Sequence, residues 1–269
     1  DSNKEIRHYE IELKDSGITY EVGDTLNVMP LNNQNLVNLI LKRLDIDENY
    51  MPSGTNETIQ NLLLEKYEIS TPNKLLIEEV VKKSKSKDLK GILTSGDKEK
   101  LDSFLWGKDI LDLLNLDKKL NFESEEFLSF LKPLQARAYS ISSSPKMHKN
   151  QVHLTISSVR WSEKERIHNG VCSTYLADMR YPFSKIGVYI SQNKSFRVPD
   201  NNAAPIIMIG PGTGIAPFRA FLEERKVRGG EGMNWLFFGD QTRKSDFIYE
   251  NEINAFKKSG ILSSLDLAF

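Results

Sequence analysis

The segment that most limits the possible fold is the apolar run "PIIMIG" (Pro205–Gly210), together with the glycine-rich turn that follows it. An apolar residue at almost every position is typical of a parallel strand that helices cover on both faces. The turn "PGTG", a helical segment, the strand "NWLFFG", a second helical segment and the strand "SSLDLAF" come next. This order predicts the start of a doubly wound α/β domain over residues 203–269.

Strands of a different kind precede this domain. The opening segment "HYEIEL" places Tyr9, Ile11 and Leu13 on one face at a period of two. The same period returns after Pro133 in "RAYSIS", "VHLTIS" and "IGVYIS". Alternation of this kind is typical of antiparallel strands with one buried face, so it predicts an antiparallel β-barrel or sandwich.

The segment between these strands has the period of helices. Residues 33–132 repeat apolar positions at intervals of three and four, as in "NLVNLILKRL". In "TPNKLLIEEVV", Thr71 is the expected N-cap and Pro72 the expected first helical residue. We therefore predict a β-barrel of residues 1–32 and 133–202, interrupted by a helical insertion. Because the α/β sheet stops at an open edge strand, we expect the chain to be a fragment.

Composition excludes several classes of partner and site. Lys and Arg number 36 against 37 for Asp and Glu, and no apolar run approaches the length of a membrane span, so we expect no nucleic-acid or membrane partner. The single cysteine, Cys172, cannot form an intrachain disulfide, which favours a cytoplasmic protein. The four histidines, His8, His148, His153 and His168, are scattered singly, so we expect no metal site.

The loop "GPGTG" (Gly210–Gly214) lies between a predicted buried strand and a predicted helix. Glycines there allow a ligand to approach the backbone, and the unpaired N–H groups of the helix favour an anion such as a nucleotide pyrophosphate. The spacing fits neither the usual dinucleotide fingerprint nor an ATP-type phosphate loop. A tight turn that only packs the helix on the strand remains an alternative.

The stretch "RAYSISSSP" (Arg137–Pro145) combines a cation, a phenol and four hydroxyls. In a strand, Arg137, Tyr139 and Ile141 share one face, so a ligand that meets all the polar groups must lie across an edge or end of the strand. A flat heterocycle with a phosphate tail meets that requirement, because Arg binds phosphate and Tyr offers a ring face. A serine-rich surface strand is the alternative.

A second anion site is predicted in "NGVCSTYLAD" (Asn169–Asp178), where Gly170 opens a helix whose first turn is small and polar. An ordinary helix start is the alternative. Two nucleotide-type sites in consecutive domains indicate that electrons pass from one bound cofactor to another.

These motifs resemble those of the ferredoxin-NADP reductase family and, within it, the diflavin reductases, which carry a helical insertion in their FAD barrel. The resemblance covers essentially the whole chain and is strongest toward the diflavin reductases of sulfite reduction. It is carried by "RAYSISSSP", "VHLTISSVRW", "GVCSTYLAD", "IIMIGPGTGIAPFRAFLEER" and "NWLFFGDQTRKSDFIYENE". It implies an antiparallel β-barrel FAD domain followed by a partial, doubly wound α/β NADP-binding domain.

The resemblance also implies roles in binding FAD. Arg137 is expected to bind the pyrophosphate, Tyr139 to pack against the isoalloxazine, and Ser140 to act catalytically by hydrogen bonding near flavin N5, where hydride arrives. The backbone of Gly170 and Val171 and the hydroxyl of Ser173 would hold the pyrophosphate from the other side. The remaining residues of the implied FAD set are Ala138, Thr155, Ile156, Ser157, Cys172, Ser70 and Trp161. The Trp161 ring would stack on adenine, or alternatively belong to the core.

For the nicotinamide cofactor, the resemblance assigns the pyrophosphate to Gly212, Thr213 and Gly214, with Arg7 reaching across from the first strand. Asp240 stands where some relatives carry a cysteine close to the hydride path. It would orient the nicotinamide or stabilise its developing positive charge; the alternative is that it caps the loop.

The implied function is that of an FAD-dependent oxidoreductase module that takes hydride from NADPH. Electrons would then pass through FMN, in a flavodoxin-like domain absent from this chain, to the sulfite-reducing haemoprotein (beta component). Segments of the family that read the NADPH 2′-phosphate and cover the flavin are also absent. Two alternatives stay open: a P450-reductase-like or other diflavin enzyme with a different acceptor, and a flavin-binding docking module without catalysis of its own.

Overall fold

The computed structural model describes residues 2–163, 166–179 and 184–269, and packing divides the chain into two compact units. We call them the strand unit and the helical unit. The strand unit consists of Asp1–Val28, Arg137–Ser158 and Ile186–Phe269, and the helical unit of Met29–Ala136 and Val159–Lys185. This division groups the segment Val159–Lys185 with the helices. The three domains expected from the sequence therefore remain a prediction.

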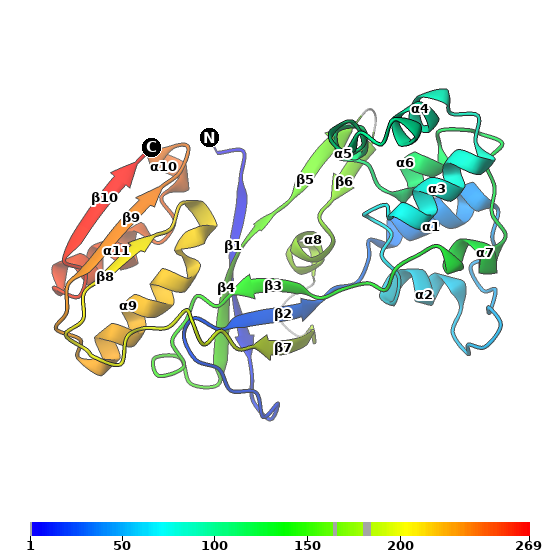
Figure 1. The fold of residues 1–269 in the computed structure, drawn as a ribbon. Coiled ribbons are helices and arrows are strands. Elements are labelled where there is room, and N and C mark those ends of the chain that lie inside the picture. Colours follow the sequence, from blue (N-terminus) through cyan, green and yellow to red (C-terminus); the bar gives the residue numbers. More distant parts are fainter. Residues whose placement is uncertain (1, 164–165, 180–183) are drawn as a thin grey trace. The chain divides into compact units, whose positions relative to one another are not determined.

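The longest antiparallel pairing in the strand unit joins β1 (Glu5–Glu12) to β4 (Gln151–Ser158) (Figure 1). Tyr9 lies opposite Leu154, and both side chains are buried. On β4 the apolar residues are all buried, which fixes the register because a slip by one residue would turn them to the other face.

A second antiparallel sheet places β2 (Thr25–Met29) between β3 (Arg137–Ser140) and β7 (Gly187–Ser191). An isolated bridge between Ile141 and Leu154 connects the continuation of β3 to β4. The strands predicted in "TLNVMP", "RAYSIS", "VHLTIS" and "IGVYIS" are thus present, as two sheets linked by a bridge.

The last part of the strand unit is a parallel sheet with helices in its connections. The sheet contains, in spatial order, β8 (Ile206–Ile209), β9 (Asn234–Gly239) and β10 (Ser264–Ala268). The connections contain the 3₁₀ turn η1 (Gly212–Ile215), α9 (Ala216–Arg228), α10 (Arg243–Asp246) and α11 (Glu250–Lys258). The predicted order of strand, turn, helix, strand, helix and strand is confirmed.

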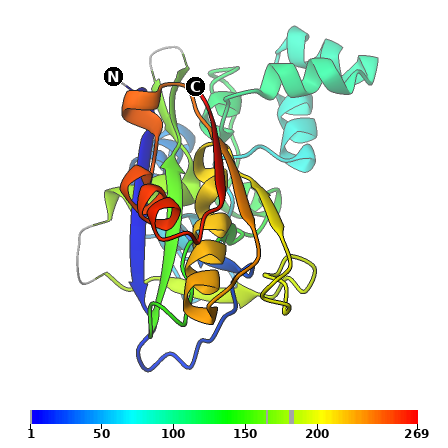
Figure 2. The ribbon, with the colours of Figure 1, turned by 90° about the vertical axis from the view of Figure 1, so that its left-hand side faces the viewer.

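The prediction that helices cover both faces of the first parallel strand is wrong for the described residues. Met208 is fully buried, whereas its neighbours Ile207 and Ile209 are 64% and 67% exposed. The reason is the strand order. Because β8, β9 and β10 succeed one another in one direction, right-handed crossovers place both connecting helices on the same face. Figure 2 shows α9 and α11 on the same side of this sheet.

The helical unit contains seven helices before its strands, all within residues 34–129. They are α1 (Gln34–Leu44), α2 (Ile59–Glu65), α3 (Lys74–Lys83), α4 (Lys87–Ser95), α5 (Lys98–Leu105), α6 (Ile110–Leu114) and α7 (Ser124–Ser129). The hairpin β5 (Arg160–Glu163) and β6 (Arg166–Asn169) and the helix α8 (Val171–Asp178) complete the unit. Apolar side chains from several helices form its core, including the fully buried Ile40, Leu63, Leu76, Leu113 and Phe127. Among the described helices, none combines the length and apolar character needed to cross a bilayer.

The start of α3 corrects one expectation from the sequence. The N-cap is Asn73 rather than Thr71, and Pro72 precedes the helix rather than opening it. The Asn73 side chain accepts hydrogen bonds from the backbone N–H groups of Leu75 and Leu76, at 3.0 and 3.3 Å. Its amide nitrogen also donates to the carbonyl of Phe130 at 2.8 Å, so one side chain both caps α3 and ties it to the end of α7.

Replacing Asn73 with Ala should lower the free energy of unfolding by about 1–2 kcal/mol, because a helix cap and a half-buried hydrogen bond are lost together. Replacing the exposed Thr71 with Ala should change it by less than about 0.5 kcal/mol. Urea denaturation followed by circular dichroism measures both. Equal effects of the two substitutions would show that Asn73 is not the cap.

Candidate functional site

A cleft in the strand unit opens where β8 and β9 end, and its volume is about 480 Å³. Open α/β sheets bind ligands at the carboxyl ends of their parallel strands. The cleft is lined by Lys4, Ile6, Ser157, Pro211, Gly212, Thr213, Gly239, Asp240 and Gln241. It therefore brings together four residues that the sequence predicted, namely Ser157, Gly212, Thr213 and Asp240.

Two glycines of "GPGTG" are required for different reasons. A Cβ on Gly210 would lie 2.6 Å from the carbonyl oxygen of Gly214, so close backbone packing excludes any side chain there. Gly212 has φ +54°, and a Cβ on it would lie 3.4 Å from the carboxylate of Asp240. A tight turn that packs the helix on the strand, the alternative to a ligand site, thus explains why residue 210 is a glycine. Gly212 and Thr213 line the cleft, whereas Gly214 lies behind them, with its N–H bonded to the carbonyl of Pro211 at 2.9 Å.

Asp240 combines a structural contact with an unsatisfied oxygen. Its side chain is 1% exposed and forms an ion pair with Lys4. Its Oδ1 accepts the backbone N–H of Gln241 at 2.7 Å, which is the loop-capping role expected as an alternative. Among the described residues, Oδ2 has no hydrogen-bond partner. Sequence reasoning missed Lys4, because nothing in the pattern of β1 shows that it meets the end of β9.

Arg7 lies on β1 opposite Ile156 and forms an ion pair with Glu5. It is not among the residues that line the cleft. Its expected contact with a cofactor pyrophosphate remains a prediction.

The stretch "RAYSISSSP" divides into two halves with different surroundings. On β3, Ala138 and Ser140 are exposed, and Arg137 and Tyr139 are half-buried. The three serines that follow β3 are fully buried. These buried serines are Ser142, Ser143 and Ser144. Four hydroxyls were expected beside a ligand, but only that of Ser140 is exposed.

The buried serines anchor the segment to α9 and to neighbouring strands. The Ser144 hydroxyl donates to Glu224 at 2.6 Å, and its backbone N–H donates to Glu223 at 2.8 Å. The Ser143 hydroxyl contacts the Tyr20 hydroxyl at 2.8 Å. Burial by itself raises the pKa of Glu224, but hydrogen bonds from Lys146, Ser144 and Arg228 together lower it below its ordinary value. These hydroxyls therefore serve the fold.

The three predicted residues of β4 point in alternate directions. Ile156 lies on one face, and Thr155 and Ser157 share the opposite face; Ile156 and Thr155 are buried and Ser157 is half-buried. The Thr155 hydroxyl is 2.5 Å from the Tyr249 hydroxyl, so it is already hydrogen-bonded. Of the three, Ser157 alone lines a cleft found in the described residues.

A second cleft lies within the helical unit, and three predicted residues contribute to it: Ser70, Trp161 and Val171. The other lining residues are Asn33, Asn35, Leu36, Leu39, Asp109, Arg166, Ile167, His168, Asn169 and Thr174. The polar groups among them come from α1 and its N-cap, the N-cap of α6, the hairpin β5–β6, α8 and the segment before α3. Such a mixture of apolar and polar walls suits part of a nucleotide cofactor.

The N-terminus of α8 borders this cleft. Gly170 is the N-cap and no side chain caps the helix, so the backbone N–H groups of its first turn have no side-chain acceptor. A Cβ on Gly170 would lie 2.8 Å from the Ser173 hydroxyl and 3.0 Å from Cβ of Val159, so only glycine fits. The Ser173 hydroxyl accepts the N–H of Val159 at 3.2 Å, and Cys172 is buried and forms no disulfide.

Trp161 is held at the edge of the cleft by two contacts. Its indole N–H donates to the carbonyl of Gly107 at 2.9 Å. Its ring stacks on His168, with 5.3 Å between centroids and an interplanar angle of 19°. The register of β5 and β6 causes this stacking, because the two residues lie directly opposite each other. Trp161 is half-buried, so its ring both packs on His168 and lines the cleft.

Sequence reasoning missed a charged cluster behind Trp161. Arg166 contacts Asp109 at 2.6 Å and Asp112 at 2.9 Å, and His168 Nε2 lies 2.7 Å from Asp112. Burial raises the pKa of Asp109. Burial opposes ionisation of Asp112 as well, but hydrogen bonds from the Asp109 backbone, His168 and Arg166 lower its pKa overall. The pairing of α6 with β6 that builds this cluster joins residues too far apart in sequence to be paired by pattern.

The remaining predicted residues, Arg137, Ala138, Tyr139 and Ser140, lie along β3 and line neither of these two clefts. Their contacts with a cofactor remain predictions.

Comparison with known proteins assigns the class. Residues 1–175 match the family described as FAD binding domain, and residues 208–262 match the oxidoreductase NAD-binding domain. The chain therefore belongs to the FAD-binding domain family, and the two domains together indicate a ferredoxin-NADP reductase-like fold.

The whole chain is also similar to curated proteins named sulfite reductase (NADPH) flavoprotein alpha-component. It is 39% identical to those of Bacillus subtilis (strain 168) over 272 residues and of Aliivibrio fischeri (strain ATCC 700601 / ES114) over 271 residues. The chain spans 45% and 44% of the length of these two relatives.

Replacing Glu224 with Gln should destabilise the chain in a pH-dependent way. Because folding lowers the pKa of Glu224, its charge stabilises the fold above the ordinary value of 4.5, and this contribution is lost as the pH falls through the folded pKa. We expect E224Q to lower the free energy of unfolding by about 1–3 kcal/mol at pH 7. The loss should be smaller at pH 3.

Urea denaturation at the two pH values measures this difference. The exposed Glu231→Gln is the matched control and should show no such dependence. An E224Q penalty of the same size at both pH values would contradict the assignment of the ionised carboxylate as the anchor of "RAYSISSSP".

Proposed function

We propose that this chain is the FAD- and NADPH-binding module of a sulfite reductase flavoprotein, an oxidoreductase that transfers hydride from NADPH to FAD. The observation that carries the proposal is the cleft at the ends of β8 and β9, which lies within a chain matching an FAD-binding domain and an NAD-binding domain. When bound, FAD supplies the two-electron chemistry, and the chain supplies binding, orientation and electrostatics.

The lining of the strand-unit cleft fits a nicotinamide nucleotide. Gly212 opens the backbone toward a ligand, and the turn Gly212–Ile215 leads into α9, whose N-terminal end favours a pyrophosphate. The unpaired Oδ2 of Asp240 offers an acceptor beside them. A carboxylate there would orient the carboxamide of the nicotinamide or stabilise the positive charge that develops on its ring as hydride leaves.

The residues expected to bind FAD also fit their roles locally. The uncapped first turn of α8 offers backbone N–H groups to a pyrophosphate, and Gly170 allows close approach. The half-buried Trp161 presents an aromatic ring for adenine. On β3, the exposed Ser140 hydroxyl can donate toward flavin N5, with Arg137 and Tyr139 on the other face of the same strand.

Further steps of the proposal concern the whole protein. The relatives are named as NADPH-dependent flavoproteins of sulfite reductase, and this chain spans less than half their length. We propose that electrons leave FAD for an FMN-binding flavodoxin-like domain and then reach the haemoprotein, or beta component, which reduces sulfite to sulfide. We further propose that the FAD-binding strands form a β-barrel, and that the protein is cytoplasmic, where a single buried cysteine such as Cys172 stays reduced.

Replacing Gly170 with Ala tests the FAD site directly. The added Cβ would collide with Ser173 and Val159 and displace the first turn of α8, so we expect FAD affinity to fall roughly tenfold or more. Fluorescence titration of flavin-free protein with FAD measures the affinity.

The matched control is Gly91→Ala on α4, because a Cβ there has no neighbour within 4 Å among the described residues. G91A should bind FAD as the unaltered chain does. Unchanged FAD affinity in a folded G170A variant would remove α8 from the proposed FAD site.

A further inference from the structure

Three of the four histidines lie close together in the strand unit, although they are separated in the sequence. His8 is on β1, His153 is on β4, and His148 precedes β4. The ring centroids of His8 and His153 are 4.9 Å apart, and those of His148 and His153 are 4.2 Å apart. The expectation that the histidines are scattered is wrong in space, because the pairing of β1 with β4 brings them together.

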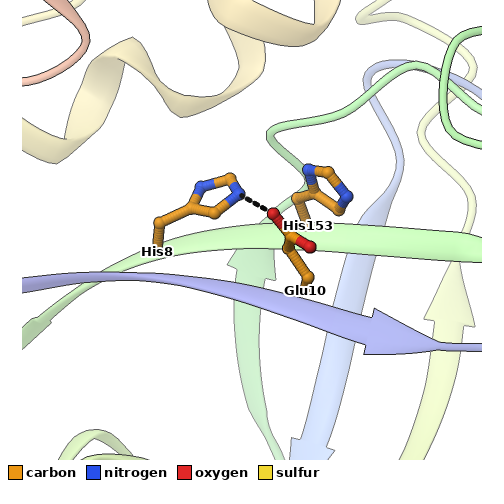
Figure 3. A group of neighbouring side chains, drawn as sticks. All are labelled: His8, Glu10 and His153. Atoms are coloured by element: carbon orange, nitrogen blue, oxygen red, sulfur yellow. Dashed lines mark ion pairs between the residues drawn. The ribbon is translucent and has the colours of Figure 1, made fainter.

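The strand register adds a carboxylate to this group. Glu10 lies directly opposite His153, and His8 is two residues before Glu10, so all three side chains share one face of the β1–β4 pair. Figure 3 shows them side by side. His8 Nε2 lies 3.8 Å from Glu10 Oε1. One potential ligand atom from each of the three lies within 4.8 Å of the others.

His153 supplies an independent indication of a ligand. The residue is 2% exposed, and its Nδ1 has no hydrogen-bond partner among the described residues. Its other ring nitrogen lies 3.4 Å from the Gln151 amide oxygen. A buried nitrogen without a partner is costly, and a bound cation would satisfy it.

A further shell holds His8 in a suitable orientation. Its Nδ1 is 2.6 Å from the Tyr249 hydroxyl, which is in turn 2.5 Å from the Thr155 hydroxyl. With Nδ1 occupied in this way, Nε2 is the nitrogen left to face Glu10. Metal-binding histidines commonly hydrogen-bond through their second nitrogen, which fixes the ring and its tautomer.

We propose that His8, Glu10 and His153 bind a divalent transition metal ion, with Zn²⁺ the best match. Two imidazoles and one carboxylate are ligands that Zn²⁺ prefers, whereas Mg²⁺ and Ca²⁺ favour sites built from oxygen atoms. In a tetrahedral zinc site the ligand atoms lie about 3.4 Å from one another. The three ligand atoms, now within 4.8 Å of one another, would therefore have to move closer together by rotation of their side chains. Water would complete the coordination.

The surrounding charges permit a cation. Arg219 is the nearby positive side chain, and it pairs with Glu223 at 3.0 Å and Glu252 at 2.7 Å. Its charge is therefore balanced locally. Asp109, Asp112 and His168 form a comparable group of potential metal ligands. That group differs because the Arg166 guanidinium contacts one ligand atom of each residue, and so already occupies the position that a cation would take.

The test is calorimetric titration of the full, untagged chain with Zn²⁺ after treatment with a chelator. We expect one Zn²⁺ per chain with micromolar or tighter affinity. His8→Gln and Glu10→Gln, both at exposed positions, should each weaken binding by about a hundredfold or more, and Tyr249→Phe by about tenfold. Glu12→Gln, on the same face of β1, is the matched control and should bind as the unaltered chain does.

Cobalt(II) provides a readout that needs no variant, because a site with nitrogen and oxygen ligands and low coordination number gives intense visible d–d bands. Appearance of such bands at one equivalent, and their displacement by Zn²⁺, would support the site. Failure of the unaltered chain to bind Zn²⁺ at millimolar concentration, or unchanged binding in both H8Q and E10Q, would overturn it. Neither result depends on FAD or NADPH.

Discussion

The antiparallel pairing of β1 with β4 is the interaction on which the strand unit depends. It fastens the first residues of the chain to a segment almost 150 positions later, and its buried apolar pairs such as Tyr9 and Leu154 fix the register. Three features follow from that register. Lys4 reaches Asp240, Ser157 lines the cleft at the ends of β8 and β9, and His8 lies beside His153. A slip of one residue would separate all three.

A second constraint is the set of buried charges on α9. Arg219 donates to the carbonyl of Ser142, while Glu223 and Glu224 accept hydrogen bonds from Ser144. Buried ionised groups are tolerated only when they are paired, so these contacts specify one arrangement of α9 against the segment that follows β3. Within the strand unit, the helix that follows the glycine-rich turn is thereby tied to the strand that carries Ser140.

The sequence was sufficient for features that depend on local pattern, and insufficient for those that depend on long-range pairing. Periodicity predicted the parallel strands and the helices of residues 34–129, and the glycines predicted the turn at Gly212, because each is a short-range property. It could not predict that Ser144 would be occupied by hydrogen bonds to Glu223 and Glu224, since these partners lie on α9. Nor could it pair Arg166 with α6, or place Lys4 at the cleft. Helices cover only one face of β8 because of the order of the strands in the sheet, and the composition of a strand does not determine that order.

We propose that the two clefts serve one redox module. The most direct measurement is an anaerobic titration of the FAD-loaded chain with NADPH, followed by the absorption of the oxidised flavin near roughly 450 nm. We expect NADPH to bleach this band, with one NADPH consumed per FAD. A chain that binds FAD but whose band is unaffected by excess NADPH would contradict this proposal, and would favour a flavin-binding docking module without catalysis.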